Sequence, residues 1–175
     1  MSFESRFSED EKFLLGNTPF AIGSTMAFSE GSGFGTIKEL YSSTKTFIDG
    51  IKAYPENVII EAIVPNMQSD EGKAKAKELQ NSYKEWVKSQ GVDSFDAMKK
   101  IVIRDAETVA KLLTDKAREN ESKEYKEWAM SIARNVANAA KEGGFLGFGG
   151  ERISEKEREF YNQIATALDT TVDVL

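Results

Sequence analysis

The chain has 175 residues, of which 40% are hydrophobic and 30% are charged, so it is long enough to form one domain with an apolar core. It contains no cysteine and no histidine, which excludes disulfides, thiol catalysis, thiolate or imidazole metal sites and Ser-His-Asp machinery. Its net charge of −6 disfavours nucleic-acid binding, because clustered lysine and arginine hold phosphate backbones. No stretch approaches the roughly 20 apolar residues that span a bilayer and no secretory signal is recognisable, so we expect a cytoplasmic protein.

Two helices are predicted before residue 30. A Ser-x-x-Glu capping box at Ser8 begins a short amphipathic segment, and Gly16-Asn17 is expected to end it, because both residue types are common helix terminators. Pro19 fits the first turn of a second helix that runs to about Ser29, since proline is favoured at that position. The sequence therefore predicts a break between the two helices.

The segment from residue 31 to residue 64 is also expected to be mostly helical. A Gly-Ser-Gly-Phe-Gly loop at 31–35 precedes a third helix, whose apolar residues recur at helical spacing from Ile37 to Ile51. A short buried helix is predicted over 55–64. The β-branched residues at 58–60 leave a strand as the alternative there.

Four further helices are predicted in the rest of the chain. Ser69, Ser94 and Ser154 are placed to cap three of them, each with acidic residues in the first turn. The clearest apolar stripe covers 125–140 and follows the i, i+3, i+4, i+7 pattern of a long amphipathic helix. A strand is the less favoured alternative over 100–104.

Together these elements predict an all-α fold, a multi-helix bundle containing two helix/Gly-Phe loop/helix units. No proline-rich linker or low-complexity tract divides the chain, so residues 1–175 are expected to form a single helical domain. Residues 69–121 are the most polar part of the sequence, and an inserted polar helical hairpin is the alternative for them.

Two glycine-phenylalanine loops, at 31–35 and 143–150, lie between similar flanking segments and suggest an internal repeat. One interpretation is a pair of helical hairpins whose loop aromatics cover the core. The other is an apolar contact surface for a protein partner or a second copy, formed by Phe34, Phe145, Leu146 and Phe148. A phosphate site is disfavoured, because neither loop has a phosphate-binding glycine pattern and acidic residues begin the helices that follow.

Carboxylates around the second loop suggest a different kind of site. Glu142, Glu151 and Glu155 are candidate oxygen ligands for a divalent cation, which flexible loops often bind. Their spacing is not that of an EF-hand loop. The alternative is that acidic residues in this region only cap helices.

The sequence Tyr-Lys-Glu-Trp occurs twice, at 83–86 and 125–128. Tyrosine and tryptophan three residues apart share one face of a helix, so each segment predicts a packed aromatic pair. An aromatic cage for a ligand is the less favoured alternative.

The second loop unit, AAKEGGFLGFGG at 139–150 followed by the Ser154–Glu157 cap, resembles a family of uncharacterised bacterial all-helical proteins. It is also similar to the tellurite-resistance TerB-like fold, in which an alanine-rich helix, an acidic-Gly turn and a Ser/Asp-x-x-Glu cap occur twice. Glu142 stands where that pattern has aspartate, and the loop is longer. The resemblance implies an all-helical fold and a non-catalytic role associated with stress or membranes.

The sequence shows no catalytic motif, so we expect no enzyme and no cofactor. A non-catalytic helical interaction or scaffold protein is the favoured function, with a protein partner or self-association, no nucleic acid, and membrane-surface contact disfavoured. The alternative is a divalent-cation-binding stress-response protein that uses the loop carboxylates. A hydrolase or lyase would need a deep pocket with convergent polar groups.

Overall fold

The computed structural model describes residues 2–28, 35–91, 94–142 and 153–171, without the side chains of 35–43 and 140–142. Within these residues the chain forms eight helices and no strand, which confirms the predicted all-α bundle. The helices are α1 (Phe3–Arg6), α2 (Glu9–Ala27), α3 (Gly35–Ala53), α4 (Val58–Ile63), α5 (Asp70–Ser89), α6 (Phe95–Lys116), α7 (Glu119–Glu142) and α8 (Glu155–Ala167). The strand alternatives at 58–60 and 100–104 are wrong, because these residues lie in α4 and α6.

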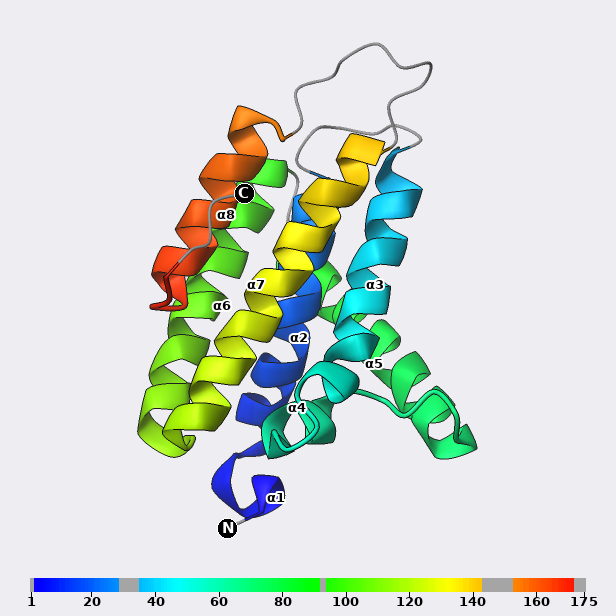
Figure 1. Cartoon of the computed structure of the whole chain (residues 1–175), viewed down its shortest axis with the longest axis vertical. Helices are drawn as coiled ribbons and strands as arrows, with labels where there is room; N and C mark the ends of the chain where they lie inside the picture. The colour runs from blue at the N-terminus through cyan, green and yellow to red at the C-terminus, as the bar shows by residue number, and fades with distance from the viewer. Residues whose placement is uncertain (1, 29–34, 92–93, 143–152, 172–175) are drawn as a thin grey trace.

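The bundle is built around α2 (Figure 1). This helix packs against α3, α6 and α7, while α3 runs along α7, and α8 lies against α6 and α7. At one end α1 lies beside α4, whereas α5 lies at the edge of the bundle and packs mainly against α2. The largest fully buried side chains are Trp128, Tyr125, Tyr161, Phe160, Leu15, Ile22, Met26, Ile59, Ile60, Leu113, Ile132 and Ile164.

The segment 69–121, for which an inserted hairpin is the sequence-based alternative, contains two helices with different surroundings. α6 packs against α2 and α8 and contributes Val102, Val109 and Leu113 to the core. α5 contributes Trp86 to that core, and many of its other side chains are exposed. The polar character of this segment therefore reflects α5 more than α6.

The N-terminal part of the bundle corrects one prediction, because α2 runs without interruption from Glu9 to Ala27. Gly16-Asn17 does not end a helix, and Pro19 lies inside one. A proline inside a helix cannot donate to the carbonyl four residues earlier, here that of Leu15. The Tyr125 hydroxyl of α7 donates a hydrogen bond of 2.6 Å to this carbonyl instead. A contact from another helix thus satisfies the group that the proline leaves unpaired.

Other signals that depend on neighbouring residues are confirmed. Two predicted capping boxes form, Ser8 with Glu11 at α2 and Ser154 with Glu157 at α8. Gly91 follows α5 with a φ of 59°, a left-handed conformation that glycine adopts without steric cost.

The two Tyr-Lys-Glu-Trp segments form the packed aromatic pairs that the sequence predicts. The ring centroids are 5.7 Å apart for Tyr83 and Trp86 and 5.5 Å apart for Tyr125 and Trp128. On α3, Gly50 faces the second pair, and a Cβ at this position would overlap the Trp128 indole. The close approach of α3 and α7 therefore requires glycine at position 50.

An ion pair joins α1 to the start of α7. Arg6 Nη1 lies 2.5 Å from Glu121 Oε2, and the two side chains are 8% and 2% exposed. The same carboxylate accepts a hydrogen bond of 2.9 Å from the Arg118 N–H. The Glu121 carbonyl accepts one of 3.1 Å from Asn57 Nδ2, and the Asn57 side chain also caps α4. Three segments distant in sequence meet at this buried group.

Candidate functional site

Most residues that the sequence singles out for function lie outside the described part of the chain. These are Phe34, Phe145, Leu146, Phe148 and Glu151. Glu142 is the last residue of α7 and only its backbone is described, and Glu155 is exposed in the first turn of α8. The apolar contact surface and the cation site therefore stay predictions.

One acidic residue that the structure describes near α8 caps the helix. The Glu157 carboxylate accepts a hydrogen bond of 2.9 Å from the Ser154 N–H. Among the described residues, no group of three or more Asp or Glu side chains is arranged to hold a metal ion. The hollows of the surface are the remaining candidates for a site.

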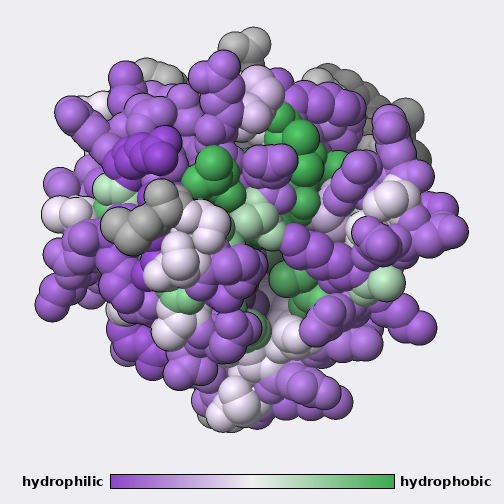
Figure 2. Space-filling model, turned by 90° about the horizontal axis from the view of Figure 1, so that it is seen from below, coloured by the Kyte–Doolittle hydropathy of each residue, from purple (hydrophilic) through white to green (hydrophobic). Residues whose placement is uncertain are grey.

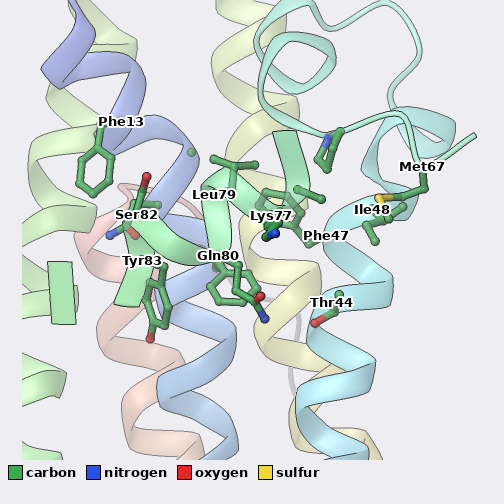
Figure 3. Close-up of a pocket in the computed structure, with 15 residues that line it drawn as sticks. Phe13, Thr44, Phe47, Ile48, Met67, Lys77, Leu79, Gln80, Ser82 and Tyr83 are labelled. Atoms are coloured by element: carbon green, nitrogen blue, oxygen red, sulfur yellow. The ribbon is translucent and has the colours of Figure 1, made fainter. Parts of the chain in front are cut away.

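A cavity of about 350 Å³ lies between α2, α3, α5 and the connection from α4 to α5 (Figure 3). Its volume is within the range of about 300–1,000 Å³ that small-molecule sites occupy. Aromatic and aliphatic side chains form most of its lining. Figure 3 shows Phe13 and Tyr83 on one side of it, and Thr44, Ile48 and Met67 on the other.

The wall from α2 is a single face of that helix. Phe13, Gly16, Asn17 and Phe20 all line the cavity, and their i, i+3, i+4, i+7 spacing places them on one side. A Cβ at Gly16 would lie 3.8 Å from Leu79 Cδ2, so α5 comes close to the backbone of α2 here. This face exists because α2 continues through residues 16–19.

The wall from α5 is the apolar side of an amphipathic helix. Ala76, Leu79 and Tyr83 line the cavity and are only half-buried, because the cavity lies between this side of α5 and α3. The rings of Tyr83 and Phe20 meet edge to face, with centroids 4.8 Å apart. This aromatic contact helps to hold α5 on α2 beside the cavity.

The cavity has a buried floor and an exposed apolar rim. Phe47, on α3, is 5% exposed, whereas Phe13 and Met67 are 37% and 41% exposed. Seen from below, the molecule shows hydrophobic atoms in hollows between hydrophilic ridges (Figure 2). Exposed apolar side chains around a hollow are typical of a binding site.

One polar group in the lining has no partner. Asn17 is 5% exposed, and its Nδ2 makes no hydrogen bond within the described part of the chain. An unpaired buried donor costs about 1–3 kcal/mol, and buried polar groups in folded proteins are nearly always hydrogen-bonded. The Asn17 amide is therefore suited to a hydrogen-bond acceptor that a bound molecule would supply.

The charge in the lining has one sign. Among the described residues that line the cavity, Lys77 carries the only ionised side chain, and no carboxylate is present. Burial raises the pKa of the Tyr83 phenol above its ordinary value, so this ring is neutral at physiological pH. The cavity offers hydrogen-bond donors and a positive charge, but no negative charge.

A second hollow of about 860 Å³ lies along α7, beside the end of α8. Its charged side chains largely satisfy one another or the backbone. Lys123 Nζ lies 3.9 Å from Glu127 Oε1, and the buried Lys126 ammonium donates to the Asp169 carbonyl at 3.2 Å. Lining groups of both signs favour no single class of ligand.

Of the cavity residues, the sequence prediction considers only Tyr83 for a ligand site, within the less favoured aromatic cage. Assigning Asn17 to a helix end separates it from Phe13 and Phe20, which share its face only in a continuous helix. The signal that could have found the site is this face, in which one polar residue interrupts an aromatic surface.

No helix within the described residues is long and apolar enough to cross a membrane. The TerB-like resemblance stays a prediction, and the cavity is the feature that bears most directly on function. No protein-family model, no curated protein and no solved structure matches this chain.

Proposed function

We propose that this chain is a non-catalytic helical binding protein that takes a small, mostly apolar molecule into the cavity between α2, α3 and α5. The apolar lining would hold the body of the ligand, since burial of apolar surface contributes about 25 cal/mol per Å². This proposal keeps the non-catalytic class favoured by the sequence and replaces the protein partner with a small molecule as the primary occupant.

The unpaired Asn17 amide is the observation that carries the proposal. A cavity lined only by apolar groups could be a packing defect, but a buried amide without a partner lowers the stability of the empty protein. A ligand carbonyl, hydroxyl or carboxylate oxygen beside Asn17 would remove this cost. The proposed ligand therefore has an apolar body and at least one hydrogen-bond acceptor.

A binding role fits the lining better than catalysis. General acid–base catalysis needs titratable groups within hydrogen-bond reach of the reacting atoms, and in a protein without histidine or cysteine these are carboxylates, lysine and tyrosine. The described lining supplies Lys77 and the neutral Tyr83 phenol, with no carboxylate to work with them.

The test places a large side chain in the cavity by a substitution on α5. Ala76 is half-buried and lines the cavity, whereas Ala74 is exposed on the same helix and does not. We expect the neutral fluorescent probe N-phenyl-1-naphthylamine to bind the wild-type protein and Ala74→Phe saturably. Ala76→Phe should weaken this binding at least about tenfold, because the added ring occupies the ligand volume.

Circular dichroism and thermal unfolding of the three proteins would establish that both variants are folded. Absence of saturable probe binding to the wild-type protein would overturn the proposal. So would equal affinity of the probe for Ala74→Phe and Ala76→Phe.

A further inference from the structure

The charges along α5 bear on what kind of apolar molecule the cavity binds. Lys73, Lys77, Lys84 and Lys88 are all exposed, and at about 100° per residue they fall within about 60° of one another around the helix. The glutamates of α5 are also exposed and lie in a second row, centred about 110° from the lysine row. The two rows are Lys73, Lys77, Lys84, Lys88 and Glu71, Glu78, Glu85.

The lysine row meets the cavity at Lys77. The apolar side of α5 that faces the cavity contains Ala76, Leu79 and Tyr83, and Lys77 lies beyond Gln80 at one edge of this side. The glutamate row lies beyond the opposite edge, next to Ser82, and none of its members lines the cavity. A ligand at the Lys77 edge of the cavity would meet an ammonium group before it met carboxylates.

Lys77 is the lysine of this row that lines the cavity, and its ammonium is not engaged. Lys73 pairs with Asp70 at 3.0 Å, and Lys75 donates to the Ala62 carbonyl. Lys77 has neither an ion pair nor a hydrogen bond with any residue in the described ranges. Its charge is therefore available to a ligand.

Resting on the proposed function, we infer that the ligand is an anionic amphiphile: a single apolar chain in the cavity and a carboxylate head group at the rim beside Lys77, with one head-group oxygen accepting from Asn17 Nδ2. The apolar walls of α2 and α3 accept the chain, and Lys77 supplies the counter-charge without requiring a carboxylate to be buried. An exposed head group avoids the large desolvation cost of a buried ion. A cationic amphiphile would be repelled at the same position.

The experiment compares three ligands with the same chain length. Dodecanoate, dodecanol and dodecyltrimethylammonium would each compete, as monomers below their micelle concentrations, with N-phenyl-1-naphthylamine bound to the protein. Lys77→Glu reverses the charge at the rim, and Lys111→Glu makes the same change at an exposed site on α6, away from the cavity.

We expect Lys77→Glu to weaken dodecanoate binding roughly fivefold, as for loss of a solvent-exposed ion pair plus an added repulsion. Lys77→Glu should also strengthen dodecyltrimethylammonium binding and change the affinity for dodecanol by less than about twofold. Lys111→Glu should cause none of these changes. These results would support the carboxylate assignment. The loss for dodecanoate should also diminish at high salt, because an exposed charge pair is screened.

The inference and the proposed function fail in different ways. If Lys77→Glu leaves the ratio of dodecanoate to dodecanol affinities unchanged while the probe still binds, the charge assignment is wrong and the binding function stands. If the probe shows no saturable binding to the wild-type protein, the proposed function itself is wrong, and the charge assignment fails with it.

Discussion

The Asn17 side chain affects both the stability of the empty protein and its affinity for a ligand. Its amide lines the cavity, is 5% exposed and has no hydrogen-bond partner for Nδ2 among the described residues. Replacing it by leucine, which has the same γ-branched shape but no polar group, removes the unpaired donor. We expect Asn17→Leu to raise the free energy of unfolding of the empty protein by about 1–3 kcal/mol, measured by urea denaturation. The same variant should bind dodecanol more weakly, because the ligand oxygen loses its donor.

Thr25 provides the matched control on the same helix. It is 2% exposed and its hydroxyl also lacks a partner among the described residues, but it does not line the cavity. Thr25→Val should therefore stabilise the protein without changing ligand affinity. A loss of affinity in Thr25→Val equal to that in Asn17→Leu would mean that stiffening of α2, and not the Asn17 amide, controls binding.

At the scale of the helix, α2 depends on a contact from α7. Pro19 leaves the Leu15 carbonyl without its intrahelical donor, and the Tyr125 hydroxyl supplies the replacement at 2.6 Å. We expect Tyr125→Phe to lower the free energy of unfolding by about 1–3 kcal/mol, because a buried carbonyl loses its partner while the ring packing is kept.

The control for this prediction is Tyr161→Phe. Tyr161 is also almost fully buried, but its hydroxyl has no hydrogen-bond partner among the described residues. Removing that hydroxyl should not destabilise the protein. Equal destabilisation by both changes, measured in the same urea titrations, would contradict the role given to the Tyr125–Leu15 hydrogen bond.

The same element shows what the sequence can and cannot predict. The capping boxes at Ser8 and Ser154 were predictable, because each depends on two residues three positions apart. The continuity of α2 was not, because it depends on Tyr125, more than a hundred positions later in the chain. Local rules read Gly16-Asn17 and Pro19 as a break, and one tertiary hydrogen bond reverses that interpretation.

The cavity escaped prediction for a related reason. Its walls come from three helices whose spacing no local pattern specifies, and its polar group, Asn17, belongs to the segment assigned to a break. The lysine row of α5 is visible in the sequence, but only the structure shows that Lys77 lies at the rim of a cavity. The apolar stripes in the sequence predicted which side of each helix is buried. They did not predict where packing between the helices is incomplete and leaves a cavity.

At the scale of the whole molecule, Glu121 holds together segments from both halves of the chain. Burial raises the pKa of this carboxyl, but the hydrogen bonds from Arg6 and from the Arg118 N–H outweigh that effect, so its pKa lies below its usual range. A carboxyl with a depressed pKa in the folded state stabilises the protein at pH values above its unfolded-state pKa, which is about 4.3 for glutamate. That contribution is lost as the pH falls from about 4.3 through the folded-state value.

Glu121→Gln should therefore destabilise the protein most at neutral pH. There it leaves the buried Arg6 guanidinium without its counter-charge, at a cost of about 3 kcal/mol. As the pH falls below about 4.3, the carboxyl becomes protonated first in the unfolded wild-type chain and then, at lower pH, in the folded protein, so the difference between the two proteins should shrink. Urea titrations across this pH range would measure it, with Glu119→Gln, an exposed change in the same turn of α7, as the control. A difference that stays constant with pH would show that the Glu121 side chain acts through packing and not through its charge.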